Sequence, residues 1–337
     1  MKRNTVIYRR ISQKVKAIIT FLIFLFLLPY VITIFIHGAD REGRQAEEVH
    51  VRAELEEETV GGNEKVIREV PWEEYFLGVL ALEVPKESEE EMLKAQAVLI
   101  RTKLYQQLLP GKETVLKERY LSTEKLRKLW GGKYETRYND LKAAIEETNN
   151  QVLFYGDTYA WAPFHKSSNG MTRDSKEALG TEEYPYLTVR ECPLDKKAEN
   201  EIQTISFTYQ EVQTRCQPFL VAVQEAEAGK VYGIEDFEIL SLDAAGYVKE
   251  LRIGQTICSG DEFRDALDLP SGSFSLQDMN GNLRITATGV GHGLGMSQWT
   301  AEELAKEGKN YEEILQFFFG GTELRDGGGI GEKMQIE

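Results

Sequence analysis

Hydrophobic and polar positions divide the chain into three stretches of different texture. Residues 17–36 form an apolar run without a single charge, residues 37–68 are polar and acidic, and the remainder alternates apolar and polar positions as folded domains do. At about 1.5 Å rise per residue, a helix over the apolar run would span roughly 30 Å, the thickness of the hydrocarbon core of a bilayer. The pattern predicts a transmembrane anchor at 17–36.

A cleaved signal peptide is the alternative interpretation of this run. Such a peptide has an apolar core of about 7–15 residues, followed by a cleavage site made of small residues. The run here is longer, and the residues after it, 37–40, make a poor cleavage site. We therefore favour an uncleaved anchor.

Charge asymmetry around the anchor predicts its orientation. Residues 1–38 hold no acid and six cations, which are Lys2, Arg3, Arg9, Arg10, Lys14 and Lys16. Cations flanking a membrane span favour the cytoplasmic side, so we expect the N-terminus inside the cell and the large C-terminal body outside it. The expected organisation is a basic tail (1–16), the anchor (17–36), an acidic solvated stalk (37–68), a folded domain (69–325) and a flexible tail (326–337).

The folded part begins with two predicted helices. Pro71 suits a first helical position, and the apolar residues that follow it recur at helical spacing as far as about Glu83. Val84-Pro85 breaks this helix. Ser88-x-x-Glu91 has the pattern of a capping box, which predicts a second helix that ends at about Leu109. A third helix is expected at 138–149.

Short strand-like runs replace the helical pattern after Gln151. The expected strands are Val152–Tyr155, Thr158–Ala162, Ile205–Tyr209, Phe237–Ser241, Tyr247–Ile253 and Leu283–Thr288. Two further helices are expected at Ser297–Glu307 and Tyr311–Phe319. Helices, then strands, then helices again predict an α+β fold in which a helical segment packs with a β-rich body.

Composition excludes one large class of partner. The chain has 337 residues, with 40 Lys and Arg against 55 Asp and Glu, a formal net charge of -15. Without the six cations of the tail the remainder carries 34 cations and 55 acids, or -21. This acidic excess argues against non-specific binding to nucleic acid, which requires clustered cations. Cys192, Cys216 and Cys258 show no CxxC spacing; in an exported body two of them could pair, and the sequence does not say which.

Three segments could carry chemistry. The first is Glu83, which lies at the helix break among apolar neighbours. Desolvation there would raise the pKa of its carboxyl, so that it could act as a general acid near neutral pH; a solvated charge is the alternative. The second is the polar loop around His165, where a role for Ser167 as a hydrolase nucleophile is disfavoured because no GxSxG frame surrounds it.

The third segment is the glycine-rich run GVGHGLGMSQW at 289–299, which holds His292. Glycine at every second position lets the backbone approach a ligand closely, or simply pack tightly. A phosphate loop is excluded because the run has no GK[ST] and no GxGxxG after a strand. His165 and His292 are too few for a metal site without carboxylate help.

These segments, in this order, resemble the stage II sporulation protein D (SpoIID/LytB domain) family. The resemblance covers roughly residues 69–324 and rests on VPWEEYFLGVLALEVPKES, EEMLKAQAVLIRTKLY, FHKSSNG, the Pro185-Tyr186-Leu187 stretch and GVGHGLGMSQW. Better-known members of this family are membrane-anchored lytic transglycosylases that cut peptidoglycan glycan strands during engulfment of the forespore. Others are described as enhancers of an amidase.

The resemblance implies that Glu83 is the catalytic acid. Expected substrate contacts, carried over to the matching positions, come from Lys94, Arg101, His165, Ser167, Tyr186, His292 and Gln298. Glycoside hydrolases use two carboxylates, whereas a lytic transglycosylase uses the 6-hydroxyl of the sugar as nucleophile and needs one. No second acid stands out near these motifs, which favours the single-carboxylate reaction.

The chain departs from the family pattern around His165. The usual His-Ser pair is His165-Lys166 here, and the usual double glycine is Asn169-Gly170. Some relatives bind zinc through a cysteine near this loop, but this chain has no Cys before Cys192, so we expect no metal and no cofactor. The expected partners are peptidoglycan glycan strands, a cell-wall amidase and a membrane scaffold of the engulfment machinery. The alternatives are a non-catalytic glycan-binding enhancer of an amidase and, ranked last, a zinc-dependent wall hydrolase.

Overall fold

The computed structural model describes residues 49–59, 62–108, 114–199, 201–220 and 232–330, and apart from Val49 these belong to one compact unit, His50–Glu337. Its strands are β1 (His50–Thr59), β2 (Gly62–Pro71), β3 (Val115–Leu116), β4 (Gln151–Tyr155), β5 (Thr158–Tyr159), β6 (Phe164–His165), β7 (Ile202–Thr208), β8 (Phe237–Leu242), β9 (Val248–Ile253), β10 (Thr256–Ser259), β11 (Phe274–Met279), β12 (Asn282–Thr288), β13 (Met296–Ser297) and β14 (Glu323–Asp326). Its α-helices are α2 (Trp72–Glu83), α3 (Glu90–Gln107), α4 (Thr123–Trp130), α5 (Tyr134–Glu147), α6 (Ser175–Leu179), α7 (Tyr209–Cys216), α8 (Gly260–Leu267), α9 (Gln298–Lys306) and α10 (Tyr311–Phe318). The expected α+β class is confirmed.

The acidic segment before the first helix corrects one expectation. Within the expected stalk (37–68), residues 50–59 and 62–68 belong to the antiparallel hairpin β1–β2, and β1 also pairs in parallel with β3. Val51 and Ala53 on β1 are buried and join the hydrophobic cluster that includes Trp72 of α2. Their alternation with polar neighbours is the period-2 signature of a half-buried strand, which the high content of glutamate hid. The folded domain therefore begins near His50.

Helices α2 and α3 lie almost where they were expected. Tyr75, Phe76 and Leu80 of α2 are buried in the same cluster as Ala97 and Leu104 of α3. The expected capping box is wrong: α3 begins after Glu89, whose side chain makes no cap, and Ser88 Oγ instead donates to Pro85 O at 3.5 Å. Helix α5 begins four residues earlier than expected, at Tyr134, because the aromatic residues at its start pack inward.

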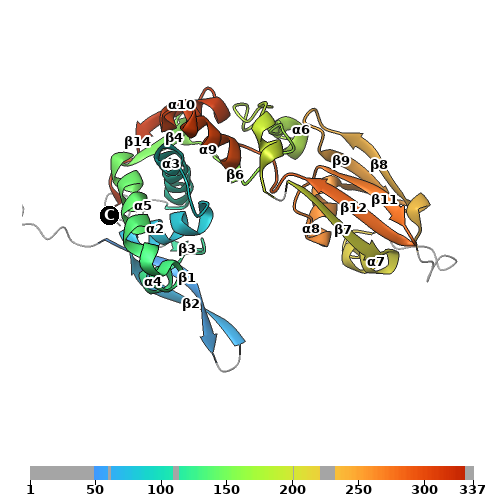
Figure 1. Ribbon diagram of the computed structural model, residues 1–337, viewed down its shortest axis with the longest axis horizontal. Helices are drawn as coiled ribbons and strands as arrows, with labels where there is room; N and C mark the ends of the chain where they lie inside the picture. Colours follow the sequence, from blue (N-terminus) through green and yellow to red (C-terminus); the bar gives the residue numbers. More distant parts are fainter. Residues whose placement is uncertain (1–48, 60–61, 109–113, 200, 221–231, 331–337) are drawn as a thin grey trace, which may run out of the picture. The chain divides into compact units, whose positions relative to one another are not determined.

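A second hydrophobic cluster joins segments that are far apart in the sequence. It contains Met92 and Leu99 of α3, Leu153 of β4, and Leu315 and Phe318 of α10. Strand β14 pairs antiparallel with β4, whose other edge pairs with β5, so the end of the domain returns to its helical part (Figure 1).

The start of the expected flexible tail (326–337) is ordered. Asp326 pairs with Gln151 in the β14–β4 ladder, and Tyr105 donates its hydroxyl proton to Gly328 O at 3.1 Å. Residues 331–337 lie outside the described residues.

Two three-stranded sheets share the third cluster. One has the order β11-β12-β7 and the other β10-β9-β8, with antiparallel pairing throughout. Buried residues of both sheets pack with Val212 of α7 and Phe263 of α8, and Figure 1 shows these two helices beside the strands. The expected strands of this region are confirmed to within three residues at each end.

The expected anchor at 17–36 and the basic tail at 1–16 lie outside the described residues. Among the residues that are described, no helix is both long enough and apolar enough to cross a membrane.

Candidate functional site

Glu83 is the last residue of α2, and its backbone is fixed by a residue from the far end of the chain. Gln298, at the start of α9, donates from Nε2 to Glu83 O at 2.8 Å and to Gln96 Oε1 at 3.1 Å. Gln96 is fully buried in α3. Gln298 therefore positions Glu83 through its carbonyl, and this arrangement brings together two of the residues expected at the site.

The Glu83 side chain is exposed, while Leu80 and Ala81 before it are buried. Partial desolvation by these neighbours raises the pKa of its carboxyl, and the cations Lys103, Lys166 and Arg119 oppose that rise. Across the described residues, no hydrogen bond or ion pair engages the carboxylate. Glu83 is therefore an unengaged carboxyl with a raised pKa, as a general acid requires.

A second carboxylate that the sequence analysis missed lies near Glu83. Glu118, in the segment between β3 and α4, raises the pKa of Glu83 through charge repulsion. Its own carboxylate accepts from Lys103 Nζ at 2.8 Å and from Gln107 Nε2 at 2.9 Å. The expectation that no second acid lies nearby is thus wrong, but both oxygens of Glu118 are engaged where those of Glu83 are not.

Lys94 does not contact Glu83. Its side chain is 10% exposed, and its ammonium group pairs with three carboxylates, those of Glu90, Glu91 and Glu147. This cluster neutralises the cation and ties α3 to α5, so Lys94 has no free donor face in this structure.

Arg101 has a structural role in place of the expected substrate contact. Its side chain, 2% exposed, donates to Gln151 O, Ile145 O and Thr148 Oγ1, and its guanidinium lies 5.0 Å from the centre of the Phe76 ring. These acceptors belong to the end of α5 and the start of β4. Arg101 therefore holds that chain reversal against α3.

We predict that Arg101→Met destabilises the protein by about 3 kcal/mol, because it leaves buried carbonyl oxygens without donors. Denaturant unfolding measures this loss. Lys103→Met is the matched control: that cation, on the same helix, is half exposed and pairs at the surface, so its loss costs less than about 1 kcal/mol. Equal losses would contradict the structural role of Arg101.

His165 and His292 lie close together in the structure, with ring centres 5.7 Å apart. Burial lowers the pKa of His165 to about 4, and burial together with the neighbouring His165 lowers that of His292 to about 3. His165 Nδ1 pairs with Leu294 O at 3.1 Å, and His292 Nδ1 accepts from Leu294 N at 3.0 Å. Both rings are neutral at physiological pH and shape the glycine-rich loop.

The alternate glycines of that loop have a packing function. Gly289, Gly291, Gly293 and Gly295 all have positive φ. A Cβ on Gly295 would overlap Pro163 O, and one on Gly291 would press against the His165 Cβ. The loop can therefore lie directly on the strand that carries His165.

Ser167 and Tyr186 are both engaged inside the protein. Ser167 Oγ donates to Glu201 Oε2 at 3.0 Å, and the Tyr186 hydroxyl donates to Trp161 O at 3.1 Å. Both side chains are buried, so neither presents its hydroxyl to a ligand in this conformation. The three cysteines are also buried, and all are free, so none of them pairs.

Glu201, which is 6% exposed, is a buried acid that the sequence did not reveal. Desolvation by burial is the main reason that the pKa of its carboxyl is raised to about 7, and the charge of Asp195 adds to the rise. The hydrogen bond from Ser167 and the charge of Lys196 oppose it. The folded state thus holds a proton on Glu201 at pH values where the unfolded chain has released it. Glu201 therefore makes the protein less stable as the pH rises from about 4.5 to about 7.

We predict that Glu201→Gln removes this part of the pH dependence. The shift corresponds to about 3 kcal/mol between pH 4.5 and pH 8, at about 1.4 kcal/mol per pKa unit. Unfolding free energies of wild type and variant, measured across that range, should diverge as the pH rises, with the variant more stable at pH 8. Parallel curves would contradict the assignment.

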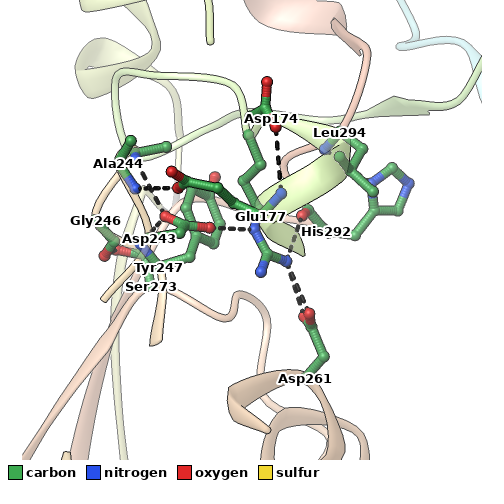
Figure 2. A network of polar contacts seen from close by, with 12 residues as sticks. Asp174, Glu177, Asp243, Ala244, Gly246, Tyr247, Asp261, Ser273, His292 and Leu294 are labelled. Carbon is green, nitrogen blue, oxygen red and sulfur yellow. Dashed lines mark hydrogen bonds and ion pairs between the residues drawn. The ribbon is translucent and has the colours of Figure 1, made fainter. Parts of the chain in front are cut away.

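An arginine network joins the segment before α6 to the second half of the domain. Arg173 donates from Nε to Asp243 Oδ2 at 2.8 Å and from Nη1 to Asp261 Oδ2 at 2.8 Å. Its Nη1 also donates to His292 O at 3.4 Å. Figure 2 shows Asp243, Asp261 and His292 around this guanidinium. The network fixes the glycine-rich loop against α8 and the β8–β9 connection.

Two hollows of the described surface are lined by residues that follow Glu83 in the sequence, though not by Glu83 itself. One, about 630 Å³, is lined by acidic residues from Glu87 to Glu90 together with Glu302 and Lys306. Another, about 430 Å³, is lined by Val84, Pro85 and Arg137 among others. His292 lines a separate shallow hollow with Arg264 and Pro270.

Comparison with known proteins assigns the chain. A family model described as "Stage II sporulation protein" matches residues 60–155. The chain is 31% identical over 274 residues to the stage II sporulation protein D of Bacillus subtilis (strain 168), covering 77% of this chain and 76% of that protein. The protein of the same name from Bacillus amyloliquefaciens is 30% identical over 271 residues with the same coverage. The chain belongs to the stage II sporulation protein D family.

A more distant relative has a different name. The amidase enhancer of Bacillus subtilis (strain 168) is 24% identical over 294 residues, which cover 73% of this chain and 40% of the enhancer.

The segment matched by the SpoIID family model contains Glu83, Lys103, Glu118 and Arg119, whereas Lys166 lies beyond it.

From the sequence, we expect a site without a metal ion. Among the described residues, no group of three or more His, Cys, Asp or Glu could hold a metal ion. The expectation of a metal-free site stays a prediction.

The cations that the sequence analysis missed share one property. Lys103, Arg119 and Lys166 come from three separate segments, and only the fold brings them near Glu83. Lys166 could have been found from the sequence, because it stands where the family pattern that this chain resembles has a serine after the loop histidine. No feature of the sequence pointed to Lys103 or Arg119.

Proposed function

We propose that this chain is a peptidoglycan lytic transglycosylase that cleaves the MurNAc–GlcNAc bond with Glu83 as its single acid and base. Family membership supports a cell-wall role in sporulation, and the geometry of Glu83 supports the reaction. The observation that carries the proposal is the unengaged Glu83 carboxyl, with a raised pKa, on a backbone anchored by Gln298.

The proposed reaction balances with one carboxyl. Protonated Glu83 donates to the glycosidic oxygen as its bond to C1 breaks, and the resulting carboxylate accepts the proton of the muramoyl 6-hydroxyl as that oxygen attacks C1. The products are a free GlcNAc 4-hydroxyl end and a 1,6-anhydromuramoyl end, and no water is consumed. Glu83 returns to its protonated state, so one group serves both halves of the reaction.

Three cations suit this task. The charges of Lys103, Arg119 and Lys166 lower the pKa of the carboxyl, so they would stabilise its anionic form once it has given up its proton. They would also attract an acidic polymer to a protein whose body carries an excess of acids. Substrate binding would therefore be local to this cluster, and it should weaken as salt is added.

The proposed location is the cell membrane, with the anchor at 17–36 and the domain outside. The proposed partners are glycan strands, a cell-wall amidase and a membrane scaffold of the engulfment machinery.

Full-length protein in detergent, incubated with peptide-free glycan strands, tests the activity. Mass spectrometry of the ends should show 1,6-anhydromuramoyl products. Intact strands, or reducing muramic acid ends alone, would contradict the proposal.

A second function is favoured by one observation, the similarity to an amidase enhancer. Such a protein would bind glycan and stimulate an amidase without cutting the strand. Adding Glu83→Gln to an amidase assay separates the two: stimulation equal to that of wild type, with no anhydro ends from either protein, would favour the enhancer.

A further inference from the structure

Asp195 is a fully buried carboxylate that neither the motifs nor the proposed reaction use. It lies in the short 3-10 helix Pro193–Lys197, and its side chain is 0% exposed. It accepts four hydrogen bonds of 2.6 to 2.8 Å, from Ser168 N, Ser168 Oγ, Ser297 Oγ and Thr300 Oγ1.

The two carboxylate oxygens serve different segments. Oδ1 accepts from Ser297, the N-cap of α9, and from Thr300 in its first turn. Oδ2 accepts both bonds from Ser168 in the loop after β6. Both segments reach the proposed acid. The first carries Gln298, which binds Glu83 O, and the second carries Lys166, whose charge acts on the Glu83 carboxyl.

We propose that Asp195 is a positioning residue that holds Gln298 and Lys166 in their places around Glu83. This inference rests on the proposed function of Glu83. Asp195 touches neither Glu83 nor any site for substrate, and it acts only through the two segments that it joins.

A carboxylate suits this position better than an amide. All four partners donate, and one of them, the Ser168 backbone N–H, cannot reverse its role. Hydrogen bonds to an ionised acceptor are the stronger kind, and a negative charge is also favourable at the N-terminus of α9. Asn at this position would offer one acceptor oxygen and turn an NH₂ group toward donors on the other side.

The test is the pH dependence of glycan cleavage by full-length Asp195→Asn. If Lys166 moves away, Glu83 loses a cation that lowers its pKa, while Lys103, Arg119 and Glu118 keep their places. The pKa of Glu83 then rises. In a plot of kcat against pH, the alkaline limb, where kcat falls as Glu83 loses its proton, therefore moves to higher pH. We also expect kcat to fall about a hundredfold with little change in KM, as for misplacement of a catalytic group.

Two further variants separate positioning from folding. Ser168→Ala removes one hydroxyl donor from Asp195 and should move the alkaline limb in the same direction by less. Asp236→Asn is the matched control, because Asp236 is also buried but accepts from Gly233 N ahead of β8. The Asp236→Asn substitution should lower the melting temperature and leave the alkaline limb of the pH profile of kcat at the wild-type pH.

The results distinguish this inference from the function on which it rests. Wild type without anhydro products would overturn the proposed function. Active wild type, with the alkaline limb unmoved in both Asp195→Asn and Ser168→Ala, would overturn the positioning role of Asp195 alone.

Discussion

Glu83→Gln should lower the rate of anhydro product formation by about a thousandfold or more, while the protein stays folded. The amide cannot donate a proton to the glycosidic oxygen or accept one from the 6-hydroxyl, and general acid–base groups contribute about 10² to 10⁴ in rate. Stability should hardly change, because the side chain is exposed and no hydrogen bond or ion pair engages its carboxylate among the described residues. Initial rates on soluble glycan strands, together with melting temperatures, measure both effects.

Glu118→Gln is the matched control for this variant. Glu118 is the other carboxylate near Glu83, but Lys103 and Gln107 engage both of its oxygens. We expect this variant to keep most of the activity. Loss of activity equal to that of Glu83→Gln, together with reducing ends in the wild-type products, would indicate a two-carboxylate hydrolase instead.

The largest effect on stability should come from Gly295→Ala. Gly295 has φ +68°, and a Cβ there would overlap the carbonyl oxygen of Pro163, which already accepts from Met296 N at 3.0 Å. The obstacle is backbone, so no side chain can rotate to relieve it. We expect a loss of about 4 kcal/mol or more, measured by denaturant unfolding, or failure to fold.

Gly308→Ala controls for the cost of the backbone conformation alone. Gly308 follows α9 with φ +89°, and nothing lies within 4 Å of a Cβ placed on it. Its replacement should cost about 1 kcal/mol. Similar losses at both positions would show that the close approach at Gly295 contributes nothing.

Elements with strong local signals were predictable from the sequence. The apolar stripe of α2 and the Pro85 that follows it placed Glu83 at the end of a helix, and α2 ends there in the structure. The hairpin β1–β2 was missed because its glutamates suggested a solvated segment, whereas burial of Val51 and Ala53 depends on a helix that comes later in the chain. Tertiary contacts, and not the local composition, determine that this segment forms a strand of the folded domain.

The charges of the site were the least predictable part. Lys94 and Arg101 lie near Glu83 in sequence, yet the fold pairs one with three carboxylates and buries the other among carbonyl oxygens. Lys166 lies more than eighty residues away in sequence and acts on Glu83 in the folded protein. No local pattern encodes such a meeting.

Glycan cleavage in water labelled with heavy oxygen tests the central claim most directly. If Glu83 directs the muramoyl 6-hydroxyl to C1, the new ends carry no heavy oxygen and are lighter by one water than hydrolysis products. Heavy oxygen at the new muramoyl ends of the wild-type products would contradict the transglycosylase mechanism, since water would then be the nucleophile.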